Sequence, residues 1–249
     1  MSIRKVKNIT HMKHALIILI RNEIEGITQL FDRVPFDKFD EVIAIDGMSN
    51  DGSVEFLEKK GIKVITQTIN GRGQAFRDAF NNTYSDTLLF YGPDGNEDPE
   101  DIVRFIQEFE SNKKIGMVVA RRLGPGSINK EDHKLFKPRK WVNIAFNGIA
   151  NLLWNRNLYV YDTINGFRAI KRTTWDVINI DTDGYTVEYQ TTIRCFKHNI
   201  PIIEFPTQEL QRIGNKVGSP AFHTGVVFIK LLLREVSLSV LEVVKVKKG

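Results

Sequence analysis

The sequence alternates short apolar runs with segments of helical periodicity, and this alternation restricts the fold more than any other feature. The apolar runs are ALIILI (15–20), EVIAID (41–46), KVIT (63–66), LLFY (88–91) and IGMVVA (115–120). Short, nearly continuous apolar runs are typical of strands buried on both faces, and the segments between them carry apolar residues at helical spacing. Regular alternation of strand and helix predicts right-handed βαβ units and a mostly parallel sheet. We therefore expect an α/β fold.

The fourth apolar run leads into a turn, GPDG (92–95), and a helix is expected to begin at Pro99, where acidic residues follow a proline. This arrangement brings Asp94, Asn96 and Asp98 to the carboxyl edge of the sheet, where open α/β sheets bind ligands. A carboxylate and an amide oxygen two residues apart are hard donors that suit Mg²⁺ or Mn²⁺. Taken alone, the segment also fits a simple Pro-Asp-Gly turn, so the metal hypothesis depends on the rest of the sequence.

The composition is that of a globular protein, with 249 residues of which 42% are hydrophobic and 26% charged. One large domain with a sizeable core is expected. The formal net charge of +5 is compatible with nucleic acid, an anionic membrane surface or a phosphorylated substrate. We expect no nucleic-acid partner, since no helix-turn-helix, zinc-finger or RNP-like pattern occurs. Neither a G-x-G-x-x-G after the first strand nor a P-loop is present, which argues against both of these nucleotide-binding folds.

The single cysteine, Cys195, cannot form an internal disulfide and favours a reducing compartment. The apolar run at 15–20 is too short for a signal peptide, and no apolar stretch is long enough to span a bilayer. We therefore expect a cytoplasmic protein that is peripheral on the cytoplasmic face of a membrane.

Six short motifs occur in an order that indicates a family. They are Asn22-Glu23, IDGMSNDGS (45–53), GRGQA (71–75), GPDGNEDPE (92–100), NGFR (165–168) and RIGNK (212–216). Each motif is weak alone, but together they resemble the family-2 inverting glycosyltransferases of the GT-A fold. Within that family the sequence is similar to the dolichol- or polyprenyl-phosphate hexosyltransferases, of which dolichol-phosphate mannose synthase is the type.

The resemblance implies a GT-A domain over residues 14–219, with a Rossmann-like, mostly parallel central sheet flanked by helices. A basic tail (1–13) precedes this domain, and an amphipathic helical appendage (220–249) follows it. Residues 141–154 and 222–246 combine apolar faces with Lys and Arg, as helices in a membrane interface do. The alternative is that these helices pack on the domain or form a homodimer contact.

The resemblance further implies transfer of a hexose from a nucleotide sugar, of the GDP-mannose or UDP-glucose type, to a polyprenyl or dolichyl phosphate. A Mg²⁺ or Mn²⁺ ion held by Asp94 and Asn96 would neutralise the charge that develops on the leaving diphosphate. The residues expected to contact the nucleotide sugar are Asn22, Glu23, Asp46, Asp51, Gly71, Arg72, Asp94 and Gly95.

A lipid phosphate is an anion at neutral pH, so it needs cations to position it rather than a general base. The candidates are Arg121, Arg168, Arg212 and Lys216, whose alternative role is ordinary surface charge. A glycan hydroxyl as acceptor would require a base, and Asp98 and Glu188 are the candidates for it. The catalytic set that covers both acceptors is Asp94, Arg212, Lys216, Glu188 and Asp98.

The sequence departs from the family pattern at Gly92, which replaces the first aspartate of the D-x-D motif. The loss of this carboxylate would weaken metal binding or alter a nucleotide contact. In the extreme it would leave a non-catalytic accessory protein that binds sugar nucleotides. Asp94, the second aspartate of the motif, remains.

Overall fold

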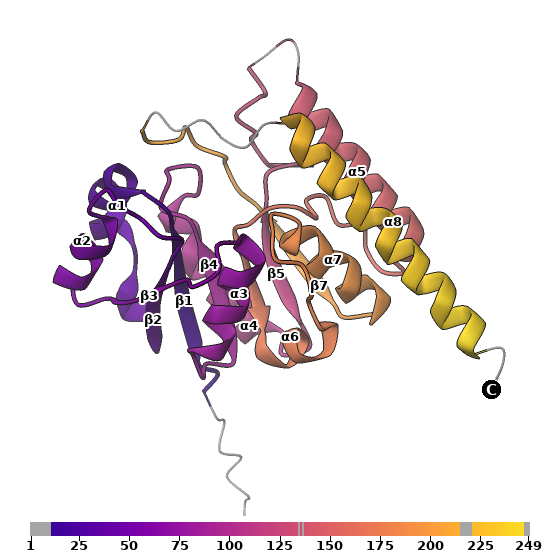
Figure 1. Ribbon diagram of the computed structural model, residues 1–249, viewed down its shortest axis with the longest axis horizontal. Coiled ribbons are helices and arrows are strands. Elements are labelled where there is room, and N and C mark those ends of the chain that lie inside the picture. The colour runs from indigo at the N-terminus through magenta and orange to yellow at the C-terminus, as the bar shows by residue number, and fades with distance from the viewer. Residues whose placement is uncertain (1–10, 134, 136, 215–220, 247–249) are drawn as a thin grey trace, which may run out of the picture.

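The computed structural model describes residues 11–133, 135, 137–214 and 221–246. Its centre is a seven-stranded sheet in the order β3-β2-β1-β4-β6-β5-β7 (Figure 1). The strands are β1 (His14–Ile20), β2 (Glu41–Asp46), β3 (Lys63–Thr66), β4 (Thr87–Tyr91), β5 (Met117–Arg121), β6 (Arg168–Lys171) and β7 (Ile202–Pro206). The α-helices are α1 (Ile24–Leu30), α2 (Ser53–Lys59), α3 (Arg72–Asn81), α4 (Ile102–Ser111), α5 (Pro138–Trp154), α6 (Arg172–Ile178), α7 (Val187–Lys197) and α8 (Ala221–Val246). Short 3₁₀ turns are η1 (Phe31–Arg33), η2 (Phe36–Lys38) and η3 (Pro99–Asp101).

The prediction of a mostly parallel α/β sheet is confirmed, with one exception at β6. Strand β6 runs antiparallel to both of its neighbours, β4 and β5, whereas the other pairs are parallel. Its sequence, RAIK, is four residues long and lacks an apolar run, so the sequence carried no strand signal there. The insertion of β6 separates β4 from β5 and shapes the edge of the sheet beside the GPDG turn.

The central strands are apolar throughout because each contributes to two cores. Leu16 and Leu89 face one core, where they pack with Phe105 of α4. Their neighbours Ile17 and Phe90 face the other core, which contains α3. Successive strand residues point to opposite faces, so burial on both sides requires the continuous apolar runs seen in the sequence.

Helices α5 and α8 lie side by side along one edge of the molecule (Figure 1). The ring centroids of Phe146 on α5 and Phe228 on α8 are 5.4 Å apart. Further along both helices, Trp154 Nε1 donates a hydrogen bond to Ser239 Oγ at 3.0 Å. The two helices are therefore parallel, and both begin at the end of the molecule where the parallel strands finish. No helix in the described ranges is long and apolar enough to cross a membrane.

A buried carboxylate anchors α8 to α7. The Glu235 side chain is fully buried and accepts a hydrogen bond from Gln190 Nε2 at 2.9 Å. It also forms ion pairs with Arg194 at 3.1 Å and Lys197 at 2.7 Å. Burial alone would raise the pKa of the Glu235 carboxyl, but these hydrogen bonds and charges outweigh it and hold the pKa below the ordinary value of 4.5.

We expect Glu235→Gln to lower the free energy of unfolding at neutral pH by about 3 kcal/mol, because Arg194 and Lys197 lose their anionic partner. The depressed pKa means that this stabilisation is complete above the ordinary value of 4.5 and is lost as the pH falls through the lower, folded-state pKa. Urea denaturation of parent and variant at several pH values would measure the difference. It should be large at neutral pH and shrink below pH 4.5. The exposed Glu58→Gln is the control, and a Glu235→Gln difference that is independent of pH would contradict the prediction.

Candidate active site

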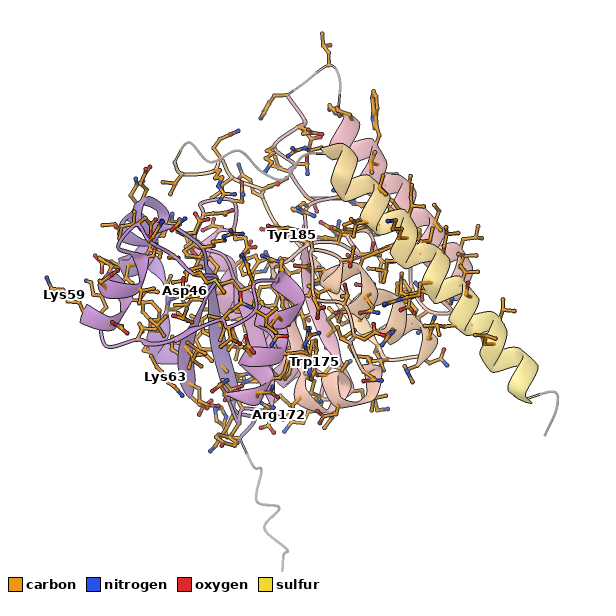
Figure 2. The ribbon with its side chains drawn as sticks, viewed as in Figure 1. Asp46, Lys59, Lys63, Arg172, Trp175 and Tyr185 are labelled. Carbon is orange, nitrogen blue, oxygen red and sulfur yellow. The ribbon has the colours of Figure 1, made fainter. Side chains whose placement is uncertain are left out.

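A cavity of about 580 Å³ opens beside the carboxyl ends of β1, β2 and β4, next to the start of α3. Its lining includes six of the residues predicted to contact substrate: Asn22, Glu23, Gly71, Arg72, Asp94 and Arg212. Figure 2 shows Asp46 and Tyr185 toward this end of the strands, whereas Lys63 and Arg172 lie toward the other. Ligand binding at the carboxyl edge is what an open α/β sheet predicts.

Two loops at this edge are joined by short polar side chains. Asn22, in a left-handed conformation with φ of 56°, accepts a hydrogen bond from the Asn50 N–H at 2.7 Å. Asp51 accepts from the Ile24 N–H at 3.1 Å and so supports the start of α1. Asp46 is 1% exposed and accepts from the Ser49 N–H at 3.0 Å. Asp46 and Asp51 therefore support the cavity rim and do not line the cavity, and their contact with the nucleotide stays a prediction.

The start of α3 packs closely against the backbone of residues 182–183 because two glycines leave room for it. A Cβ atom at Gly71 would lie 2.3 Å from the carbonyl oxygen of Asp183, and one at Gly73 would lie 2.1 Å from that of Thr182. Any other residue at either position would displace this backbone. The Gly73 N–H donates a hydrogen bond to the Asp183 carbonyl at 2.8 Å, so this approach fixes the start of α3 beside the cavity that Gly71 and Arg72 line.

Arg72 follows the first of these glycines, and its guanidinium is oriented by an ion pair with Glu188. The Glu188 side chain is 3% exposed and forms an ion pair with Arg72. Gly166 makes room for the pair, since a Cβ there would lie 2.1 Å from Arg72 Nη2. Glu188, predicted as a candidate base, instead orients Arg72 and does not line the cavity.

Arg212 joins two carboxylates across the cavity. Its guanidinium lies 2.6 Å from Glu23 Oε1 and 3.2 Å from Asp94 Oδ2. The contact ties the ends of β1 and β4 to the segment that follows β7. The negative charge of Asp94 is therefore compensated by Arg212.

A second cavity of about 210 Å³ shares Arg72, Gly92 and Asp94 with the first and extends it inward. We call it the inner pocket. Two basic side chains in its lining were missed by the sequence analysis. Arg122 pairs with Asp162, with Nε 2.9 Å from Oδ2, and Lys130 pairs with Glu209 at 2.9 Å. The sequence analysis had named Arg121, one residue before Arg122, as a candidate cation, and Lys130 lies in a loop with no distinctive pattern.

Asp94 and Asn96 form a compact donor pair at the junction of the two cavities. Asn96 donates its N–H and its side-chain amide to the two oxygens of Asp94, each at 2.9 Å. No group of three or more His, Cys, Asp or Glu side chains suited to a metal ion occurs in the described part of the chain. The residues fit Mg²⁺ or Mn²⁺ bound together with a substrate diphosphate, since such ions commonly take one or two protein oxygens and complete their shell with phosphate and water.

Glu97 is a further inner-pocket residue that the sequence analysis did not single out. Its carboxylate accepts a hydrogen bond from the Gly92 N–H at 2.7 Å. Removal from water and the nearby charge of Asp94 raise the pKa of Glu97 to about 8. Its position between Asn96 and Asp98 was visible in the sequence, but the direction of its side chain was not.

Two of the arginines proposed to hold an acceptor phosphate lie elsewhere. Arg168 is fully buried, and its guanidinium donates to the carbonyl oxygens of Asn165 at 2.7 Å and Glu188 at 2.8 Å. It stabilises the fold and cannot reach an acceptor. Arg121 donates to the carbonyl of Leu123 at 3.1 Å and does not line either cavity. Lys216 lies outside the described residues.

Asp98 and Gly95 also have structural roles. Asp98 accepts from the Glu100 N–H at the start of η3 and pairs with Arg33 at 3.0 Å, so it is not available as a base in either cavity. Gly95 has φ of +89°, and a Cβ there would lie 2.7 Å from Ile213 Cγ1. It permits the turn to pack closely rather than lining the nucleotide cavity.

Comparison with known proteins identifies the family of this chain. Residues 15–178 match the family model described as "Glycosyl transferase family 2". The chain belongs to glycosyltransferase family 2. As a family-2 member it is a nucleotide-sugar-dependent glycosyltransferase, which confirms the family predicted from the six motifs.

The relatives of this family-2 chain are distant. It is 24% identical over 225 residues to the glycosyltransferase AglJ of Haloferax volcanii, a match that covers 86% of this chain and 69% of AglJ. The structure of glucosyl-3-phosphoglycerate synthase from Mycobacterium tuberculosis superposes with a TM-score of 0.68 at 18% identity, covering 90% of this chain and 80% of that one. The same enzyme in complex with Mn²⁺ and UDP-glucose gives a TM-score of 0.62 at 16% identity, covering 89% and 77%. These likenesses confirm the GT-A-like fold.

We expect Arg168→Lys to lower the free energy of unfolding by about 3 kcal/mol, because a lysine cannot replace the several hydrogen bonds of the buried guanidinium. Urea denaturation would measure the loss. The exposed Arg156→Lys is the matched control and should stay within about 0.5 kcal/mol of the parent. An Arg168→Lys protein of parental stability would show that the guanidinium is not needed by the fold and would return it to the list of substrate-binding candidates.

Proposed function

We propose that this family-2 glycosyltransferase moves a hexose, with inversion, from a nucleotide sugar to a polyprenyl or dolichyl phosphate, as dolichol-phosphate mannose synthase does. The observation that carries the proposal is the connection between the inner pocket and an apolar surface. Lys130 lines this pocket, and the carboxylate of the next residue, Glu131, accepts a hydrogen bond from the Lys140 N–H in the first turn of α5 at 3.0 Å. A phosphate bound near Lys130 would therefore lie near the start of α5, whose exposed apolar side chains are suited to a lipid tail.

The larger cavity is suited to the nucleotide sugar. Arg72 and Arg212 provide positive charge around a space large enough for a nucleoside diphosphate. Mg²⁺ or Mn²⁺, when bound by Asp94 and Asn96, would neutralise charge on the departing diphosphate. Arg72 would stabilise the same charge without having to move, because Glu188 already fixes it.

The acceptor side favours an anion over a hydroxyl. In the described residues, three of the four carboxylates that line the two cavities are ion-paired, Glu23 and Asp94 with Arg212 and Glu209 with Lys130, while Glu97 accepts the Gly92 N–H. A phosphate oxygen needs no base, since it attacks the anomeric carbon as an anion. The new carbon–oxygen bond forms as the bond to the diphosphate breaks on the opposite side of the ring, which inverts the configuration.

The lipid part of the acceptor is suggested by an apolar edge formed by α5 and α8. We define this edge by its exposed side chains: Trp141, Val142, Ile144, Leu152, Leu153, Val226, Ile229, Leu233, Val240 and Leu241. Helix α5 also carries Arg139 and Lys140 and has no acidic residue. Exposed apolar stripes with adjacent basic charge are typical of helices that lie in an anionic membrane interface.

A transfer assay tests the reaction. Labelled GDP-mannose, UDP-glucose and UDP-N-acetylglucosamine would each be incubated with a short polyprenyl phosphate and Mg²⁺ or Mn²⁺, with and without chelator. We expect chelator-sensitive label in the organic phase with one donor, and a loss of about 100-fold in kcat for Asp94→Asn because charge stabilisation at the leaving group is removed. Asp98→Asn is the control and should retain activity.

The same assay separates the alternatives. Transfer to a glycan hydroxyl with none to the lipid phosphate would contradict the proposed acceptor. Metal-dependent nucleotide binding without transfer to any acceptor would indicate a sugar-nucleotide-binding accessory protein.

A sedimentation assay with anionic phospholipid vesicles tests the apolar edge. Leu152 is 84% exposed and Leu233 is 61% exposed, so replacing both with Asp should leave the fold intact. We expect the double variant to lose about tenfold or more in vesicle affinity, because two leucines that would enter the lipid interface are replaced by charges that anionic lipid repels. Tyr84→Asp, at an 89% exposed position near the opposite end of the sheet, is the control. The edge would instead be identified as a homodimer contact if the parent does not bind vesicles but forms a dimer, and the double variant stays monomeric.

A further inference from the structure

The space beside Gly92 is occupied by a carboxylate from another position. If Gly92 had a Cβ atom, its nearest neighbours would be the two carboxylate oxygens of Glu97, both at 3.8 Å, and the Cδ at 3.9 Å. The Glu97 carboxylate also accepts the Gly92 N–H at 2.7 Å. An aspartate side chain at position 92 would extend into this same region.

The turn between the two residues is built to hold Glu97 there. Gly95 has a left-handed φ of +89°, which lets the chain reverse direction. The Ile213 N–H donates to the Asp94 carbonyl at 2.8 Å, and the Leu210 N–H donates to the Asn96 carbonyl at 3.0 Å. The turn is thus fastened to the segment after β7 on both sides of Gly95, and the position of Glu97 follows from a constrained backbone.

We propose that Glu97 supplies the carboxylate that Gly92 cannot, so that the cation and the diphosphate meet two acidic side chains, Asp94 and Glu97, instead of an Asp-x-Asp pair. The inference rests on the proposed function, because it assumes that a divalent ion and a nucleoside diphosphate bind at this junction. Glu97, Asp94 and Asn96 all line the inner pocket.

The charge environment of Glu97 agrees with this role. Asp94 has a cationic partner in Arg212. Among the described residues Glu97 has no ion-pair partner, and its carboxylate accepts a hydrogen bond from the neutral Gly92 N–H. A partly buried carboxylate whose partner is a neutral N–H is costly to maintain, and a bound cation would offset that cost. A cation bound with the diphosphate would provide a charged partner for Glu97.

Binding of Mn²⁺ in the presence of UDP or of GDP, followed by electron paramagnetic resonance, tests the proposal without requiring turnover. Four proteins would be compared: the parent, Glu97→Gln, Gly92→Asp, and the variant that carries both changes. Glu97→Gln keeps an oxygen that can accept the Gly92 N–H and removes only the charge. We expect it to weaken Mn²⁺ affinity about tenfold or more.

Gly92→Asp alone should also bind Mn²⁺ less well, because two carboxylates would compete for one space and repel each other. The combined variant should recover Mn²⁺ affinity to within about threefold of the parent, since position 92 then provides the charge that position 97 has lost. This recovery distinguishes a shared role from general damage to the site. Glu100→Gln, at an exposed position of the same segment, is the control, and thermal unfolding of every variant verifies the fold.

The outcomes separate this inference from the proposed function. A parent that binds Mn²⁺ with a diphosphate while Glu97→Gln stays within about twofold of it would overturn the role of Glu97 alone. A combined variant no better than the weaker single variant would do the same. A parent that binds Mn²⁺ with neither diphosphate would overturn both the proposed function and the role of Glu97.

Discussion

The substrate cavity depends on how the charge of Asp94 is balanced. Arg212 compensates Asp94 and Glu23 together, and in doing so it links the ends of β1 and β4 to the segment after β7. A guanidinium and a divalent cation compete for the same carboxylate oxygens. In the proposed reaction, cation binding therefore requires Arg212 to turn toward another anion, and the diphosphate of the donor is one. Cation, diphosphate and Arg212 then form a single charge-balanced unit rather than three independent contacts.

Arg72 contributes charge in a different way, because its partner is fixed in the interior. Glu188 is buried at the start of α7, and Gly166 leaves the space in which the two side chains meet. This pairing keeps the guanidinium oriented whether or not substrate is present. In the proposed reaction, Arg212 exchanges partners and takes part in substrate binding. Arg72 is held in place by Glu188 and stabilises charge on the leaving diphosphate.

Much of the fold was predictable because it follows from burial. Strands such as β1 and β4 are covered on both faces, so their apolar runs are continuous and easily recognised. Strand β6 was not predictable, because it is short and its pairing partners are distant in the sequence.

Motif membership predicted which segments meet at the cavity, but not which way individual side chains point. Arg168 belongs to a motif and is buried in the core, whereas Arg122 and Glu97 lie beside predicted residues and face the inner pocket. The direction of a side chain depends on its position within the strand and on the geometry of the turn, and neither can be read from the identity of a single residue.

The polar anchor of α8 has a consequence for the geometry of the whole edge. A helix with apolar residues on several sides can slide along its neighbour with little loss of contact. Glu235 prevents this, since its carboxylate reaches Gln190, Arg194 and Lys197 at only one axial position. A shift of one helical turn would leave a buried charge without partners. The axial register of α8, and with it the position of the apolar edge relative to the rest of the domain, is therefore set by one buried carboxylate.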